Sequence, residues 1–278
     1  MTVRIVTDST SDIPLPLIEE LSIKVVPVIV RFGNQEFRSG VDLTSQEFYS
    51  MLATSGIHPH TSQPAPEEFA KVFREPGPDC EGIICINISA KLSGTINSAN
   101  QGKSMADSKC PIEIIDSRFN SIGLGIIVIK AAKLAKSGAG LPQIIDTIKM
   151  DIEKIRMLGI FDTMKYLVRG GRVSQIRAHA ARILNVKPML TFIDGEVAQA
   201  GLVRSYDKGM NKIVDFVRDQ GKILDLAIAH SMVAERAAEL KFRLGGLFPV
   251  NSILITELGP ALGVHGGPGV LLVALRKG

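Results

Sequence analysis

Two hydroxyl-bearing side chains follow an apolar, strand-like run in the first half of the chain. Residues 82–88 are rich in isoleucine, and Ser93, Gly94 and Thr95 come soon after them, at the start of a predicted helix over residues 95–105. The first backbone N–H groups of a helix have no partner within the helix, and they favour an anion. Two hydroxyls at positions i and i+2 exceed what one helix cap needs. The segment therefore predicts a binding site for a phosphate or a carboxylate.

Two further segments carry side chains that could contribute to such a site. Asp116 follows another predicted strand, where an aspartate is also typical of an ordinary turn. Thr61 and Ser62 lie in a loop that is bounded by prolines, and we interpret them as hydroxyl donors. His58 and His60 in the same loop form only a weak metal pattern, because no nearby carboxylate or third histidine completes a ligand set. We expect both histidines to face solvent.

The second half of the chain contributes two more candidates. His265 lies in a run of glycine and proline over residues 264–269, where a functional histidine and a solvent-exposed one are equally consistent with the sequence. Arg204 ends a predicted strand, and an isolated arginine there is more typical of a surface charge. Neither the P-loop spacing nor the GxGxxG spacing occurs, which disfavours a nucleotide site.

Composition narrows the class of protein. The chain has 278 residues, of which 45% are hydrophobic and 22% charged, with a net charge of +4 and no tryptophan. This size suits one large or two medium domains. The small, dispersed charge and the sparse aromatics argue against nucleic acid binding.

Three features of the sequence predict the cellular compartment. No apolar run reaches the length of a membrane span, and the first residues enter a predicted strand directly, without a signal peptide. The three cysteines are odd in number and lack CxxC spacing, which favours unpaired thiols. Together these features predict a reduced, cytoplasmic protein that is not inserted in a membrane.

The elements that must position the candidates alternate between strand-like and helical runs, which is typical of an α/β fold. We predict two domains: residues 1–158, with a mostly parallel sheet covered by helices, and residues 159–278, an α+β domain with a mixed or antiparallel sheet. Asp194 and Gly195 lie between two strand-like runs and predict a hairpin there. The apolar helices predicted over residues 122–135 and 178–184 could line a tunnel.

Several short motifs, in a fixed order along essentially the whole chain, make the sequence resemble the DegV family of bacterial fatty-acid-binding proteins. Each motif is weak alone, but their joint order and spacing are specific. They are Thr7-Asp8-Ser9 with Asp12, Thr61-Ser62-Gln63-Pro64, Leu92-Ser93-Gly94-Thr95, Ile115-Asp116-Ser117-Arg118, Tyr166-Leu167 with Gly170-Gly171-Arg172, Lys187-Pro188, Arg204, and His265-Gly266-Gly267-Pro268-Gly269. Gly266 departs from the pattern, because threonine is more frequent at this position.

The resemblance implies a long-chain fatty acid in a buried apolar tunnel, with no catalysis by the chain itself, no cofactor and no metal. It implies that a separate ATP-dependent fatty acid kinase converts the bound carboxylate to an acyl phosphate for phospholipid synthesis. The residues it implies at the carboxylate are Thr61 and Ser93, with Arg204 and His265 as a supporting polar pair, and Ser62, Gly94, Thr95 and Asp116 in the surroundings.

Two other functions remain as alternatives. An acyl hydrolase would use Ser93 as nucleophile, His265 as base and Asp116 to orient the base, although Ser93 lacks the GxSxG context of a nucleophile elbow. A phosphate or nucleotide binder would use the same helix start, and the absence of a P-loop lysine counts against it.

Overall fold

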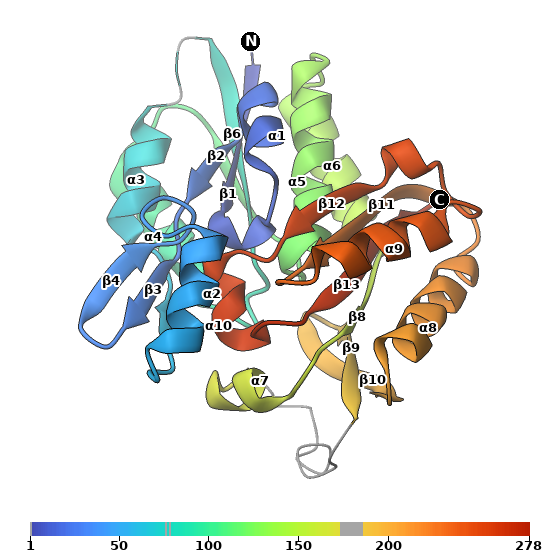
Figure 1. Cartoon of the computed structure of the whole chain (residues 1–278). Coiled ribbons are helices and arrows are strands. Elements are labelled where there is room, and N and C mark those ends of the chain that lie inside the picture. The colour runs from blue at the N-terminus through green and yellow to red at the C-terminus, as the bar shows by residue number, and fades with distance from the viewer. Residues whose placement is uncertain (1, 76, 78, 173–185) are drawn as a thin grey trace.

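The computed structural model describes residues 2–75, 77, 79–172 and 186–278, which form three β-sheets and the helices around them (Figure 1). The predicted α/β class is confirmed, with one parallel sheet and one mixed sheet. The helix that the sequence predicts over residues 178–184 lies outside the described residues.

The first sheet consists of four parallel strands, buried on both faces. Alternate residues of its central strand point to opposite sides: Ile83 and Cys85 pack under α3 and α4, whereas Ile84 and Ile86 pack under α5 and α6. Such two-sided burial is typical of parallel sheets. The strand order is β2 (Lys24–Val26), β1 (Thr2–Asp8), β6 (Cys80–Asn87) and β7 (Ile112–Asp116), and the helices are α1 (Leu15–Glu20), α3 (Pro66–Arg74), α4 (Thr95–Ala106), α5 (Ser121–Lys136) and α6 (Leu141–Ile152).

The second sheet has six strands and is mixed. Only β11 and β12 run parallel within it, and the predicted hairpin at Asp194 and Gly195 joins β9 to β10, with both turn residues at positive φ. The strand order is β10 (Glu196–Val203), β9 (Lys187–Ile193), β8 (Ile155–Ile160), β13 (Leu271–Lys277), β11 (Ile223–His230) and β12 (Leu254–Glu257).

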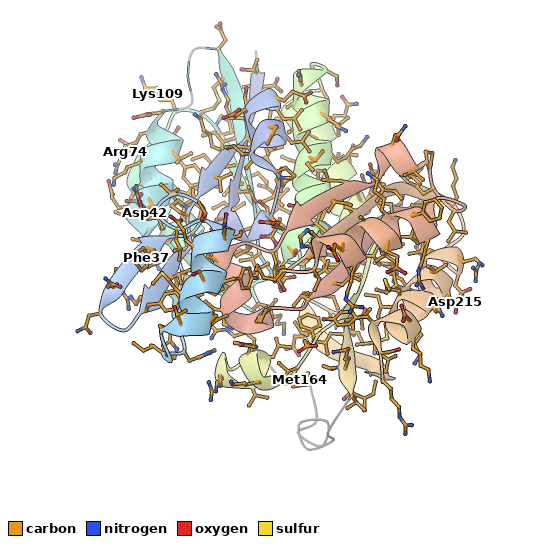
Figure 2. The ribbon with its side chains drawn as sticks, viewed as in Figure 1. Phe37, Asp42, Arg74, Lys109, Met164 and Asp215 are labelled. Atoms are coloured by element: carbon orange, nitrogen blue, oxygen red, sulfur yellow. A yellow bond between two sulfur atoms is a disulfide. The ribbon has the colours of Figure 1, made fainter. Side chains whose placement is uncertain are left out.

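A small antiparallel sheet of β4 (Gln35–Arg38), β3 (Ile29–Phe32) and β5 (His60–Ser62) lies beside the first sheet, next to α2 (Ser45–Thr54). Figure 2 labels Phe37 and Asp42 on this side of the molecule. The sequence predicts one strand over residues 24–32, but the chain leaves the first sheet at Pro27 and starts β3 in another sheet. Proline lacks the N–H that a continuous ladder needs. The loop predicted around Thr61 is instead strand β5.

Helix α5 joins the two large sheets into one core. It packs against β1 on one side and against β11 and β13 on the other. Gly123 permits close approach to β8, because a Cβ there would lie 2.2 Å from the Sδ atom of Met157. The helix predicted to extend to residue 156 ends at Ile152, and β8 follows. The predicted domain boundary at residue 158 falls inside β8.

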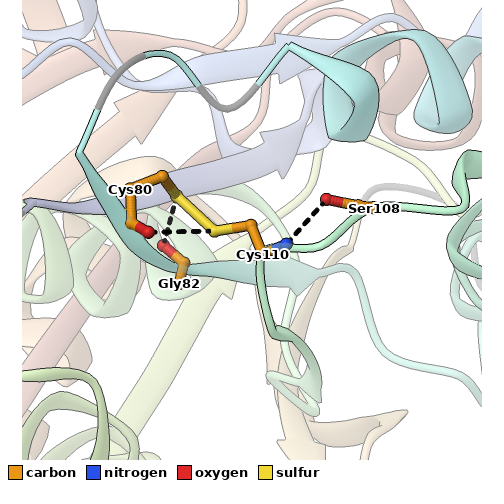
Figure 3. The surroundings of a disulfide bond; sticks show 4 residues. All are labelled: Cys80, Gly82, Ser108 and Cys110. Atoms are coloured by element: carbon orange, nitrogen blue, oxygen red, sulfur yellow. Dashed lines mark hydrogen bonds between the residues drawn. A yellow bond between two sulfur atoms is a disulfide. The ribbon is translucent and has the colours of Figure 1, made fainter.

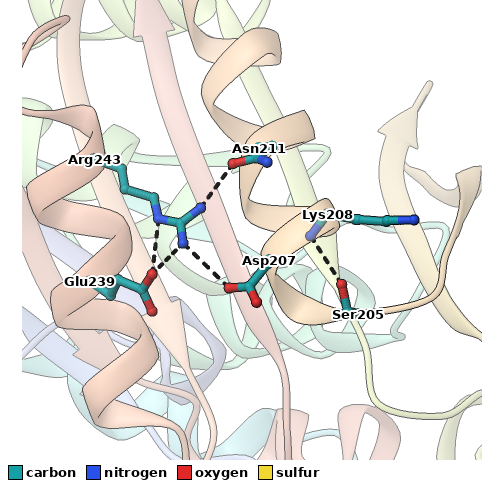
Figure 4. Close-up of polar contacts among 6 residues, drawn as sticks. All are labelled: Ser205, Asp207, Lys208, Asn211, Glu239 and Arg243. Atoms are coloured by element: carbon teal, nitrogen blue, oxygen red, sulfur yellow. Dashed lines mark hydrogen bonds and ion pairs between the residues drawn. The ribbon is translucent and has the colours of Figure 1, made fainter.

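Helices α8 (Tyr206–Arg218) and α9 (Ala234–Leu244) cover the other face of the second sheet. Arg243 of α9 holds them together: its guanidinium donates to Asn211 Oδ1 at 2.9 Å and to Asp207 Oδ1 at 3.3 Å, and it also pairs with Glu239 (Figure 4). Ser205 caps α8 by accepting the backbone N–H of Lys208.

Two short helices, α7 (Lys165–Arg169) and α10 (Pro260–Gly266), contact each other at the side of the molecule where Figure 2 labels Met164. The sequence predicts a flexible turn around residues 264–269, but Pro260 begins a helix that extends to Gly266. Gly267 ends it at φ +69°.

The cysteine prediction is wrong for two of the three residues. Cys80, at the start of β6, and Cys110, just before β7, form a disulfide (Figure 3). Cys85 remains a free, buried thiol. The sequence did not predict this pair, because the cysteine count is odd and the spacing of residues 80 and 110 matches no local motif. Within the described ranges, no helix is both long and apolar enough to cross a bilayer.

Candidate functional site

Thr61 and His265 meet although they are 204 residues apart in the sequence. The Oγ1 atom of Thr61 on β5 lies 3.0 Å from Nε2 of His265 on α10. Strand β5 is held in place by β3, where Val30 is the register partner of Thr61. The pairing of β5 with β3 and the packing of α10 against both therefore create this contact.

The Ser93 segment lies against the Thr61 segment. Gly94 is the N-cap of α4, and a Cβ there would lie 2.3 Å from Oε1 of Gln63. Glycine thus lets the loop that carries Ser93 closely approach the end of strand β5, which carries Thr61. The hydroxyl of Ser93 lies 2.8 Å from that of Thr95, which is buried behind it.

These two segments form one wall of a polar pocket. Its lining includes Thr61, Ser62, Ser93, Gly94 and His265, five of the eight residues that the sequence and the resemblance put forward. The pocket also includes polar residues that the sequence analysis did not single out as candidates for the site, namely Thr10, Gln63, Asn120 and Arg172.

An apolar cavity adjoins the polar pocket. Its walls are almost entirely aliphatic and aromatic. Five residues line both spaces, so that the polar pocket opens onto the apolar cavity: Asn120, Leu167, Val197, Leu262 and His265. The deeper walls come from β8, β9 and β13 of the second sheet and from residues at the ends of its strands, with Met157, Leu158, Phe161, Leu190, Phe192, Leu258, Val270 and Leu272.

Three of the expected residues lie elsewhere. Arg204 is exposed after β10 and lines neither space. Asp116 holds its own loop, since its carboxylate accepts the backbone N–H groups of Ala90 and Arg118. Thr95 supports Ser93 without lining the pocket.

Two of the residues that were overlooked carry a signal in the sequence. Arg172 ends the Gly170-Gly171-Arg172 motif, and Thr10 follows Thr7-Asp8-Ser9. The buried Asp8 explains the position of Thr10, because its Oδ1 accepts both the backbone N–H and the hydroxyl of Thr10. Asn120 has no local signal, and only the packing of the sheets brings it to the pocket.

The His265 imidazole is neutral near pH 7. Its pKa is lowered to about 3, mainly by burial and in addition by the positive charge of Arg172. Its Nδ1 is buried and has no hydrogen-bond partner within the described part of the chain. The backbone of Gly170 packs against this atom so closely that a Cβ would lie 2.1 Å away.

His58 is half-buried, contrary to the expected solvent exposure, while His60 is exposed. The ring of His58 packs beside Tyr166, and burial lowers its pKa. Among the residues that the structure describes, no group of three or more His, Cys, Asp or Glu side chains could hold a metal ion.

A family model described as "Uncharacterised protein, DegV family" matches residues 2–277. The chain belongs to the DegV family. A DegV domain-containing protein of Caldanaerobacter subterraneus subsp. tengcongensis is 36% identical over 271 residues, which cover 96% of this chain and 95% of that protein.

Two solved DegV structures superpose over the whole chain. The first, described as showing fatty acid binding of a DegV family protein from Thermus thermophilus, has a TM-score of 0.91 and 30% identity, with 100% of each chain covered. The second, described as DegV, a fatty acid binding protein from Bacillus subtilis, has a TM-score of 0.89 and 29% identity, again with 100% of each chain covered.

Proposed function

We propose that this chain binds a long-chain fatty acid, with its carboxylate in the polar pocket and its tail in the apolar cavity. One observation carries the proposal: a pocket lined by four hydroxyl side chains from three separate segments opens directly onto a cavity lined by apolar side chains. The fatty acid binding described for the Thermus and Bacillus relatives supports the same ligand class.

The two halves of such a ligand have different energetic needs. A tail of about fourteen methylenes gains roughly 11 kcal/mol when it leaves water, at about 0.8 kcal/mol for each methylene. Burial of the carboxylate opposes this gain unless hydrogen-bond donors replace the lost water. A site for the whole molecule therefore needs hydroxyl donors at the entrance of an apolar space.

The donors we assign to the carboxylate are Thr61 and Ser93. Thr61 can donate to the ligand only if His265 donates its Nε2–H to the Thr61 oxygen, which places the imidazole in its Nε2–H tautomer. His265 thus orients the Thr61 hydroxyl. The guanidinium of Arg172, which lines the same pocket, adds the positive charge that a bound carboxylate favours.

We further propose that a separate kinase phosphorylates the bound carboxylate, with this chain as the lipid-presenting subunit in the cytoplasm. The carboxylate would lie in the open polar pocket, where a partner can reach it. Arg204 is exposed and outside both spaces, so we assign its contribution to contact with the kinase instead of the ligand.

Native mass spectrometry of protein purified from cells tests the ligand. We expect a bound species with the mass of a long-chain fatty acid, which is lost after delipidation and regained when the acid is added back. A delipidated protein that takes up neither saturated nor unsaturated acids would contradict the proposal.

The hydrolase alternative receives no support from the geometry. The hydroxyl of Ser93 is hydrogen-bonded to Thr95, whereas His265 is bonded to Thr61. Asp116 contacts backbone N–H groups of its own surroundings. A catalytic triad requires mutual contact between a nucleophile, its base and an orienting carboxylate, and these three side chains do not make such contacts.

A further inference from the structure

A second groove lies on the other side of α10 and shares no lining residue with the polar pocket or the apolar cavity. Pro260 of α10 lines the groove, whereas its neighbours Ala261 and Leu262 line the polar pocket. Its lining combines polar side chains from the loop after β1 with apolar side chains of α1 and β12.

The groove lies where strands from both large sheets end. Strand β1 is followed by Ser9, Ser11 and Asp12, which line it, and β11 and β12 end at His230 and Glu257, which line it too. In α/β proteins, ligands bind beyond the carboxyl ends of parallel strands. Two of the parallel pairs, β1 with β2 and β11 with β12, end here.

His230 provides the first observation that favours a ligand site here. Only 4% of its surface is exposed, and its Nδ1 is buried with no hydrogen-bond partner among the residues described. Buried polar side chains are nearly always hydrogen-bonded. Burial also lowers the pKa of His230, so that the ring is neutral at pH 7 and offers one acceptor nitrogen.

The charge of the groove is the second such observation. Glu257 is the register partner of His230 on the neighbouring strand, and its carboxylate is close enough to oppose the fall in the pKa of His230. Asp12 contributes another carboxyl group, whose oxygens accept from Ser121 and Gly259. The residues described along the groove include these two acids and no lysine or arginine.

The remaining walls are apolar. Leu15 of α1 is 64% exposed at the rim, and Ile18, Val25 and Ile255 lie along the sides. An isolated exposed leucine is ordinary, but here it borders a concave surface with several other apolar side chains. The groove therefore combines an apolar wall with hydrogen-bond acceptors and negative charge.

We propose that this groove binds a small organic cation, with its ammonium group between His230 and Glu257 and a compact apolar body against Leu15 and Ile255. An anion would meet the carboxylate of Glu257, and the described lining contains no lysine or arginine to offset it. The site is thus opposite in charge preference to the polar pocket, where Arg172 and hydroxyl donors favour a carboxylate. It does not depend on the proposed fatty acid function.

Titration of the full chain with phenethylammonium tests the site, with 3-phenylpropionate as an anion of similar shape. We expect calorimetric binding of the cation alone, together with a shift of the His230 ring signals in NMR spectra. Glu257→Gln should weaken binding about tenfold to a hundredfold, because it removes one charged acceptor. Glu19→Gln, on the same side of α1 but outside the lining, is the matched control and should bind normally.

A second variant keeps the test informative if changes on β12 disturb folding. Leu15→Ser alters an exposed side chain. It should weaken binding of the cation, because it removes an apolar contact, and it should not lower the stability of the protein. The proposal fails if the anion binds as well as the cation, if Glu257→Gln binds normally, or if Ser93→Ala abolishes the binding. The last result would place the probe in the fatty acid pocket instead.

Discussion

The side chain of Asp12 holds the start of the helix that carries His265: its Oδ1 accepts the backbone N–H of Gly259, the residue before α10, at 2.9 Å and across 247 residues of sequence. Its other oxygen accepts the hydroxyl of Ser121 at 2.6 Å, at the start of α5. The backbone carbonyl of Asp12 accepts the hydroxyl of Thr256 at 2.5 Å. Asp12, which lies in the segment after β1, therefore links α5, β12 and α10.

Asp12 should make stability depend on pH. Burial raises its pKa from 3.8 to about 7, despite the two hydrogen bonds that favour the charged form. A carboxyl group whose pKa is raised in the folded state contributes to the stability of that state. The contribution is complete at pH values below the pKa of the unfolded state, and it is lost as the pH rises through the pKa of the folded state. Asp12→Asn should abolish that decline, which is on the order of a few kcal/mol between about pH 4 and pH 7.

Urea denaturation at a series of pH values measures this effect as the difference between the native protein and the variant. The comparison removes the contribution of the buried histidines, which both proteins share. Asp42→Asn is the control, because its pairing with Arg38 lowers the pKa of Asp42 to about 2, below the window. An unchanged pH profile in Asp12→Asn would contradict the assignment.

Removal of either hydroxyl at the polar pocket should weaken fatty acid binding. Thr61→Ala and Ser93→Ala each delete one donor to a charged group, which is worth roughly 1.5–3 kcal/mol, or about tenfold to a hundredfold in affinity. Displacement of a fluorescent fatty acid measures the change, and circular dichroism checks the fold. Thr54→Ala at the exposed end of α2 is the matched control. Unaltered lipid retention in the Thr61→Ala, Ser93→Ala double variant would remove the site assignment.

Gly94→Ala should reduce binding more than it reduces stability. The new methyl group would lie 2.3 Å from the end of the Gln63 side chain, which is exposed and can move away. Because Gln63 lines the polar pocket, its displaced side chain changes the shape of the pocket beside Thr61 and Ser93. We expect lower affinity with a melting temperature close to that of the native protein. Gly246→Ala, where a Cβ meets no atom within 4 Å, should leave both unchanged.

The disulfide should affect stability without affecting the lipid site. Cys80 and Cys110 join the amino-terminal ends of β6 and β7, whereas the polar pocket lies beyond their carboxyl ends. A cross-link across 30 residues contributes about 2–4 kcal/mol. Cys80→Ser should lower the free energy of unfolding by that amount and make it insensitive to reductant. Fatty acid affinity should stay the same, and a variant that loses lipid binding while folded would count against this separation.

Local sequence determined the parts of the fold that depend on a few neighbouring residues. The strand before Ser93 and helix α4 follow from an apolar run and a helix start, and the hairpin at Asp194 and Gly195 follows from residues that adopt positive φ readily. The ordered motifs also sufficed to place the chain in the DegV family, because each motif is a short run of neighbouring residues that can be recognised in the sequence.

The tertiary structure alone decided which of these segments meet. Thr61 contacts His265, Cys80 pairs with Cys110, and Arg172 lines the pocket while Arg204 does not. Backbone preferences act over a few residues, whereas these contacts depend on how α5 packs between two sheets and how Pro27 diverts the chain into a third. Packing between distant elements produces no local sequence pattern at the residues that it brings into contact. For that reason the sequence alone could not predict these contacts.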